Sequence, residues 1–325
     1  FGGETVGKVV ICNAVTGKTK TYDVGNVPQW VDRVYSADLL VNLFDYYGKL
    51  KHGFFNSVLS QKDCLETTDG YNYLALNDDV WIANMKKLGY SQEDANDYYN
   101  MGCVEIMVPG KQPNWGVCEA IAFPVLIENV MKEWKKNPEK IQTFDDFMKL
   151  YYAEVDEAVE ADYQDVVKKK ATMKDQCYDP YCSLLIDGCL ENGKDMLQGG
   201  SECPMHWSVY AYGIGTVADS LCAVKKFIFD EKKITMEEMY DALQKNFEGY
   251  EEMQAMLLKE TPSYGNGIDE VDDIANDVLS HFNEAVMDLN KKAKTDKFVS
   301  TLFGYFFHIY HGEIAGATPD GRMKG

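Results

Sequence analysis

The chain has 325 residues, which suits one large domain or two of ordinary size. Its 32 basic and 52 acidic residues give a net charge of −20, which argues against non-specific binding to nucleic acid or anionic membranes, because phosphate groups are bound by clustered Lys and Arg side chains. Hydrophobic residues make up 46% of the chain, enough for a buried core, and no apolar run approaches the ~20 residues that span a bilayer.

The N-terminal segment predicts a β-hairpin followed by a helix. Val6–Cys12 and Thr19–Val24 have the composition of strands and flank a turn at Thr16–Lys18. Ala37–Gly48 has the apolar spacing of a helix, with Gly48 as its stop signal.

Most of the remaining chain predicts helices with recognisable starts. Ser91 and Thr143 precede acidic residues as N-caps do, and Thr235 with Glu238 forms a capping box. The predicted helices are Asp79–Leu88, Ser91–Asn100, Ala120–Lys135, Thr143–Lys170, Thr235–Phe247 and Asp269–Leu289.

The segments between these helices favour an α/β fold. Gly102–Gly116 contains several Gly and Pro residues, which predict a loop. Short segments such as Ser183–Ile186 separate long helices, which is more typical of an α/β protein than of a helical bundle. We find no repeat or linker, so residues 1–325 are predicted to form a single unit.

The cysteines indicate a reducing compartment. There are nine, an odd number in a long chain, whereas a disulfide framework is dense and even. Cys177, Cys182 and Cys189 contain no C-x-x-C pair, so small buried apolar side chains are a better interpretation than a zinc site. The first residues, Phe1–Glu4, lack the features of a signal peptide and include no initiator Met. We expect a cytoplasmic protein without a bound metal.

The segment Gly102-Cys103-Val104-Glu105 carries the strongest chemical signal. In an extended backbone, the Cys103 thiol and the Glu105 carboxyl would lie on the same face, because side chains at i and i+2 share a face. A cysteine that acts on substrate, with a carboxyl that moves a proton, is one interpretation. The alternative is a buried Cys beside an exposed Glu, and these four residues alone favour that alternative.

A series of motifs along the chain favours the catalytic interpretation of Cys103 and Glu105. Gly102–Glu105, followed by Pro109-Gly110-Lys111, resembles the active-site loop of glycyl radical enzymes, the pyruvate formate-lyase-like superfamily. Thr318–Arg322 contains the T-P-D-G-R signature of that family. The other matching segments, in the family's order, are Leu76–Asp79, Glu93–Tyr98, Asp187–Asp195, Gly199-Gly200, Val217–Leu221, Asn246–Tyr250 and Tyr264–Asn266. The resemblance covers about residues 70–325.

The resemblance implies a fold and a set of partners. The fold is a ten-stranded α/β barrel made of two five-stranded halves, with the cysteine loop entering its centre, present here only in part. The radical is stored on a backbone glycine by an iron–sulfur activating enzyme that uses S-adenosylmethionine, so no cofactor is bound by the chain itself. The resemblance also implies a homodimer that acts on a small molecule.

Two departures from the family pattern affect these expectations. After Gly199-Gly200 the chain reads Ser201–Pro204 where relatives often have Ala-Arg-Tyr, which puts the identity of the substrate in question. The R-V-x-G-Y loop of the radical glycine does not occur among these residues. We therefore expect a central portion of such an enzyme, without the glycyl radical loop and inactive alone.

The resemblance assigns a role to each residue of the loop. Cys103, as a thiyl radical, would abstract a hydrogen atom from a substrate C–H bond, and Glu105 would remove a hydroxyl proton and so assist elimination, as in a dehydratase. Gly102 stands where the acetyl-transferring branch has a second cysteine, which disfavours acetyl transfer. The alternatives are a radical arylacetate decarboxylase and, from another class, a non-catalytic scaffold or a fragment that lacks the radical glycine.

Four other side chains are candidates for contact with substrate. His206, Trp207 and Tyr210 follow closely after Gly200, and Trp115 follows the reactive loop. Ordinary packing in the core is an equally good interpretation of His206, Trp207 and Tyr210.

Overall fold

The computed structural model describes residues 5–12, 17–28, 31, 34–64, 66–67, 78–101, 105–113, 116–293, 295–302 and 308–325. The chain divides into two compact units, Phe1–Trp81 and Ile82–Gly325, and each is described by itself. The sequence predicts a single unit that belongs to one catalytic domain. That assignment stays a prediction, because the two units are not placed relative to one another.

The first unit contains the predicted hairpin and helix. Strands β1 (Lys8–Cys12) and β2 (Thr19–Asp23) pair antiparallel, with Lys8 opposite Asp23. Helix α1 (Ala37–Leu50) begins after Ser36, whose hydroxyl accepts a hydrogen bond from the backbone N–H of Leu39. Two short turns of helix, Val24–Asn26 and Asn56–Ser60, complete the described elements of this unit.

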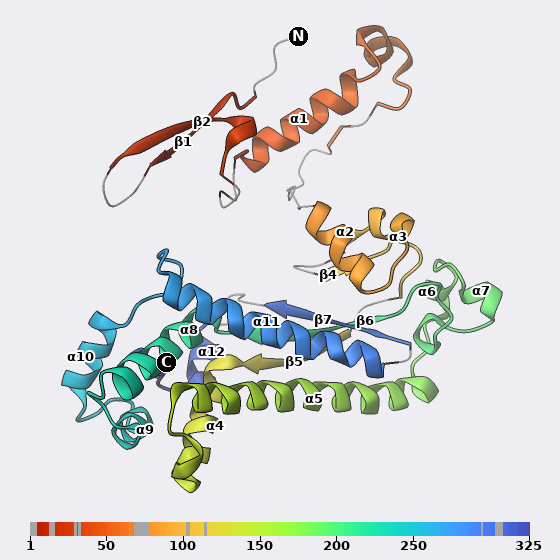
Figure 1. Ribbon diagram of the computed structural model, residues 1–325. Coiled ribbons are helices and arrows are strands. Elements are labelled where there is room, and N and C mark those ends of the chain that lie inside the picture. The colour runs from red at the N-terminus through yellow and green to blue at the C-terminus, as the bar shows by residue number, and fades with distance from the viewer. Residues whose placement is uncertain are drawn as a thin grey trace. The chain divides into compact units, whose positions relative to one another are not determined.

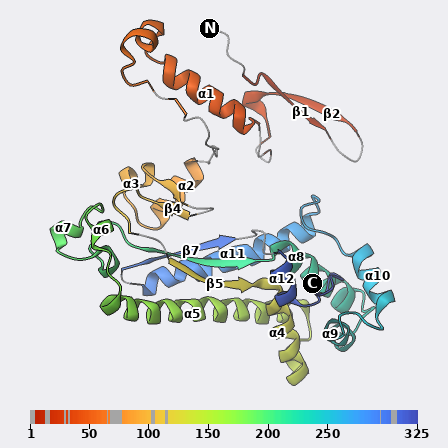
Figure 2. The same cartoon turned by 180° about the vertical axis from the view of Figure 1, so that it is seen from behind.

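The second unit is organised around a three-stranded parallel sheet (Figures 1 and 2). Its strands are β5 (Gly116–Ala122), β6 (His206–Tyr212) and β7 (Lys297–Leu302), with β6 in the middle. Trp207 lies opposite Gly116 on one side and opposite Phe298 on the other. The sequence predicts none of these strands, and the seven residues of β6 are all buried.

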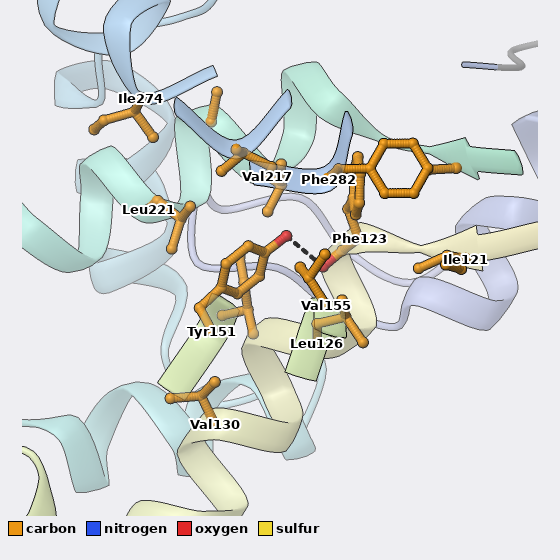
Figure 3. Packing of buried hydrophobic residues seen from close by; sticks show 14 of the residues in the cluster. Ile121, Phe123, Leu126, Val130, Tyr151, Val155, Val217, Leu221, Ile274 and Phe282 are labelled. Atoms are coloured by element: carbon orange, nitrogen blue, oxygen red, sulfur yellow. Dashed lines mark hydrogen bonds between the residues drawn. The ribbon is translucent and has the colours of Figure 1, made fainter. Parts of the chain in front are cut away.

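Long helices cover one face of this sheet. Helices α5 (Phe144–Gln176) and α11 (Asp269–Lys292) run alongside the strands, α5 against β5 and α11 against β7 (Figure 1). Helices α4 (Phe123–Lys136) and α8 (Ile214–Ala223) pack against them and each other. The apolar side chains between these elements form the main core, where the Tyr151 hydroxyl donates to the carbonyl of Phe123 at 3.4 Å (Figure 3).

Two predicted helix starts are confirmed in full. Thr143 with Asp146, and Thr235 with Glu238, form reciprocal capping boxes before α5 and before α9 (Met236–Gln244). The remaining described helices are α2 (Asp78–Lys87), α3 (Gln92–Asn96), α6 (Pro180–Ser183), α7 (Cys189–Asn192), α10 (Glu251–Glu260) and α12 (His308–Ala315), with shorter turns at Pro138–Lys140, Met196–Gln198 and Val224–Asp230.

Three predicted boundaries are wrong. The helix predicted up to Asn100 ends at Asn96, and Glu105–Met107 is a strand inside the predicted loop. The helix predicted from Ala120 begins at Phe123, because the residues before it alternate between faces as part of β5. Strand pairing, a long-range effect, determined these boundaries, which local composition obscured.

Candidate functional site

Glu105 lies at the start of a short strand. Strand β4 (Glu105–Met107) pairs antiparallel with β3 (Tyr99–Met101), and Met101 is opposite Glu105. The Glu105 side chain is only 5% exposed, which excludes the alternative of an exposed Glu at this position. Cys103, two residues before it, lies outside the described residues.

Strand β6 has two chemically different faces. Successive side chains of a strand point to opposite faces, and Trp207, Val209 and Ala211 belong to the helix-covered core. The other face therefore presents the intervening side chains, which are His206, Ser208, Tyr210 and Tyr212. We call these four residues the polar face of β6.

Tyr210 connects this polar face to Glu105. Its hydroxyl donates a hydrogen bond to Oε1 of Glu105 at 2.7 Å, between two residues that are 105 positions apart in the chain. A hydrogen bond to a carboxylate is stronger than one between neutral groups, and it offsets part of the cost of burying the carboxylate. The pair can hold a carboxylate in a fixed orientation within a buried site, as a proton acceptor requires.

His206 forms a second buried contact on the same face. Its Nε2 atom lies 2.6 Å from the hydroxyl of Tyr90, and the two rings meet edge to face with centroids 5.6 Å apart. Burial, with a smaller contribution from the positive charge of Lys297, lowers the pKa of His206 to about 4, because the imidazolium loses its hydration. The imidazole is therefore neutral at physiological pH.

Gln112 extends this contact. Its side-chain Oε1 accepts a hydrogen bond from the backbone N–H of Val108 at 3.1 Å and lies 3.5 Å from the hydroxyl of Tyr90. The side chain is buried, and its Nε2 finds no acceptor in the part of the chain that the structure describes.

The structure brings together two of the predicted site residues, Glu105 and Tyr210, through their hydrogen bond. His206 lies on the same face of β6, where it contacts Tyr90. Trp207 lies on the opposite face, where it packs in the core and donates from Nε1 to Asp296 at 3.0 Å. Trp115, like Cys103, lies outside the described residues.

Tyr90 and Gln112 are missed by the sequence reasoning. No local pattern marks Tyr90, because its contact with His206 depends on how separate segments pack. The contact of Gln112 with Val108 lies within a single loop. The alternation of polar and apolar residues along His206–Tyr212 was a signal that could have shown the strand and its polar face.

Two further findings concern metals and membranes. Among the residues that the structure describes, no three or more His, Cys, Asp or Glu side chains are grouped so that they could hold a metal ion. None of the described helices combines the length and the apolar character needed to cross a bilayer.

Comparison with known proteins identifies the family. Residues 60–312 match the sequence profile described as pyruvate formate lyase-like, which is well over half of the chain. The chain belongs to the pyruvate formate lyase-like family. This confirms the resemblance that the motifs from Leu76 to Arg322 indicated.

Comparisons with individual proteins agree with this family assignment. The trans-4-hydroxy-L-proline dehydratase of Clostridioides difficile is 30% identical over 267 residues, which covers 76% of this chain and 32% of that protein. The isethionate sulfite-lyase of Bilophila wadsworthia is 28% identical over 268 residues, which covers 76% of this chain and 31% of that protein. The glycerol-bound B12-independent glycerol dehydratase of Clostridium butyricum has a TM-score of 0.70 at 32% identity, and the match covers 77% of this chain and 33% of that structure.

The extent of these matches defines what the chain represents. It spans about a third of the length of the relatives that it matches. The predicted fold is confirmed for the part that it spans: the chain carries a portion of the α/β barrel of glycyl radical enzymes, and the parallel sheet β5–β6–β7 with its helices belongs to that portion.

Proposed function

We propose that the protein containing this chain is a glycyl radical lyase that eliminates a leaving group from a small hydroxylated substrate. The observation that carries the proposal is the buried hydrogen bond between Tyr210 and Glu105. Glu105 stands two residues after Cys103 in a G-C-V-E loop. The dehydratases and the sulfite-lyase among its relatives support the class of reaction.

Each residue has a defined part in this reaction. The thiyl radical of Cys103 takes a hydrogen atom from a substrate C–H bond, which leaves an S–H bond and a carbon radical. Glu105 accepts the proton of the hydroxyl group on that carbon, and the leaving group departs from the neighbouring carbon. The product radical then takes the hydrogen atom back from Cys103. The hydrogen bond from Tyr210 keeps the Glu105 carboxylate in place as the acceptor.

The proposal also implies partners. A backbone glycine supplies the radical to Cys103, and an iron–sulfur activating enzyme that uses S-adenosylmethionine installs it. A second copy of the protein completes the homodimer that the family resemblance implies.

The test compares two variants of the full-length, activated enzyme on a panel of small hydroxylated substrates. Cys103→Ser should abolish turnover, because an O–H bond is far harder to convert to a radical. Glu105→Gln should lower kcat by about 10²–10⁴-fold, because the amide cannot accept the proton. The glycyl radical doublet in electron paramagnetic resonance serves as the control for activation in both variants.

Product analysis separates the alternatives. Loss of water or of another leaving group supports the proposal. Release of carbon dioxide from an arylacetate would contradict elimination and support the decarboxylase. An activated protein that turns over no substrate, or unchanged kcat in Glu105→Gln, would also contradict the proposal.

A further inference from the structure

Strand β5 contains a β-bulge where it passes Tyr210. In its pairing with β6, Val117 lies opposite Ser208 and Ala120 lies opposite Tyr210. Three residue steps along β5 therefore match two along β6, so β5 carries one extra residue between these two pairs. The burial pattern of the strand changes at the same point, because Glu119 and Ala120 are consecutive exposed residues.

The bulge decides which side chain of β5 stands beside Tyr210. Paired residues of neighbouring strands share a face of the sheet, with the strands about 4.8 Å apart. In a strand without the extra residue, Glu119 would lie opposite Tyr210 on that shared face. The bulge puts Ala120 there instead, and the following residue, Ile121, belongs to the helix-covered core. A methyl group thus takes the place of a second carboxylate beside the residue that holds Glu105.

The two neighbours of Tyr210 in the sheet differ in exposure. Ala120 of β5, on one side, is exposed. Thr301 of β7, on the other side, is buried, with 8% of its surface exposed. Among the residues that the structure describes, the sheet face around Tyr210 is therefore open on the side of β5 and covered on the side of β7.

The charges on the open side disfavour an anionic ligand. The carboxylate of Glu105 lies close by, and Glu119 is exposed directly next to Ala120 in the chain. Among the residues of β5, β6 and β7, the cationic side chain on this face is Lys297, four residues before Thr301. That separation is roughly 13 Å along a strand, which exceeds the distance over which exposed charges act in physiological salt.

We propose that Ala120 is a specificity-determining residue, and that the substrate is a small uncharged vicinal diol whose alkyl end lies over Ala120. The inference rests on the proposed role of Glu105 as the acceptor of a hydroxyl proton. The methyl side chain leaves room for the alkyl end, and the neighbouring carboxylates disfavour a substrate that carries a carboxylate or sulfonate there. The alternative is that another part of the longer protein covers Ala120, so that no substrate reaches it.

A larger side chain at position 120 tests the proposal. Ala120→Leu is compared with the wild type as full-length, activated enzyme on ethane-1,2-diol, propane-1,2-diol and butane-1,2-diol. Leucine should fill the space of the alkyl end, so the ratio of kcat/KM for butane-1,2-diol to that for ethane-1,2-diol should fall about 10–200-fold. An equal change in kcat/KM for all three diols would overturn the inference.

Two neighbouring residues offer matched controls. Thr301→Val keeps the size of the other neighbour of Tyr210 and removes only its hydroxyl group. Glu119→Gln removes the carboxylate that a strand without the bulge would place beside Tyr210. Both variants should leave the ratio of kcat/KM values unchanged. A larger change in Thr301→Val than in Ala120→Leu would put the alkyl end on the side of β7, against the proposal.

A parallel assay separates this inference from the proposed function. Glu105→Gln and the wild type are tested on the three diols and on isethionate, a hydroxylated anion. If the wild type acts on isethionate but on none of the diols, and Glu105→Gln is inactive, the proposed function stands and the inference fails. If Glu105→Gln is as active as the wild type, or no substrate is turned over, the proposed function fails.

A binding measurement then decides the inference without catalysis. In full-length Ala120→Cys before activation, reaction of the new thiol with N-ethylmaleimide is followed by mass spectrometry. Slower labelling in the presence of butane-1,2-diol, but not of isethionate, would support a diol lying over position 120. Labelling that neither compound slows, or no labelling at all, would overturn the inference.

Discussion

At the scale of single residues, the site depends on burial as much as on residue type. A carboxyl that is 5% exposed loses nearly all contact with water, and the Tyr210 hydroxyl at 2.7 Å replaces part of that hydration. The imidazole of His206 meets the same cost by remaining neutral, with a pKa of about 4.

The Tyr210 hydroxyl should therefore matter for catalysis. Tyr210→Phe keeps the ring and removes the hydrogen bond to Glu105, which should lower kcat by about 10–100-fold, the equivalent of ~1.5–3 kcal/mol for a hydrogen bond to a charged group. Tyr212→Phe on the same face of β6 is the control, since the Tyr212 ring stacks on His311 at 3.7 Å and the ring is retained. Equal kcat in the two variants would show that the Tyr210–Glu105 bond has no catalytic role.

A second buried carboxyl should make stability depend on pH. Asp162 of α5 is 7% exposed, and its Oδ2 has no hydrogen-bond partner among the described residues. Burial, together with the nearby carboxylates of Glu119 and Asp165, raises the pKa of Asp162 to about 7. The folded chain therefore binds more protons than the unfolded chain between pH ~4 and 7, so stability falls as pH rises through that window.

Asp162→Asn should remove this dependence. We expect the Tm of the wild type to fall between pH 5 and pH 8 by about 2–4 °C more than that of the variant, which corresponds to roughly 1 kcal/mol. Calorimetry at the two pH values measures it, with Glu157→Gln on the exposed side of the same helix as the control. Parallel pH profiles for the wild type and Asp162→Asn would show that Asp162 is ionised in the folded state.

At the scale of elements, β6 is the part of the structure on which the site depends. One face of the strand contributes to the core, and the other contacts Glu105 and β4. Its neighbour β5 approaches closely at Gly116, where an added Cβ atom would lie 2.3 Å from Cε3 of Trp207. The absence of a side chain at Gly116 leaves room for the Trp207 indole.

Gly116→Ala should disturb that approach. The methyl group would force the Trp207 ring to move inside a packed core, at a cost of about 1–3 kcal/mol in the free energy of unfolding. Chemical denaturation measures the change. Gly7→Ala is the control, because nothing lies within 4 Å of an added Cβ there, and it should change stability by less than ~0.5 kcal/mol. If the two variants were equally stable, the close contact between Gly116 and Trp207 would be wrong.

At the scale of the whole molecule, the two units contribute unequally to the core. The main apolar cluster draws its buried residues from Cys118 to Phe298, all within the second unit. In the described part of the first unit, the buried residues are Gly48 and Ser57, and neither provides an apolar side chain. Stability should therefore reside in the second unit.

A chain that begins at Asp78 tests this. We expect residues 78–325 to unfold cooperatively with a Tm within about 5 °C of that of residues 1–325, since the main hydrophobic core is retained. Circular dichroism followed through a thermal scan measures it. A loss of cooperative unfolding in the shorter chain would mean that the first unit supplies part of the core.

The sequence by itself determined the local features of this protein. The N-cap at Thr143 and the capping box at Thr235 predicted where two helices begin, and the first hairpin was predicted from its composition. The G-C-V-E loop and the T-P-D-G-R signature, in the family's order, predicted the family. These signals are readable because caps, turns and motifs depend on residues that are close together in the chain.

Only the tertiary structure decided which side chains meet. The partner of Glu105 is 105 residues away, and Tyr90 is 116 residues from His206. The separation of Trp207 from His206 and Tyr210 followed from strand β6, which the sequence reasoning did not predict. Strand pairing and the choice of the face that helices cover are long-range effects, and no local pattern around Glu105, Tyr90 or Gln112 contains them.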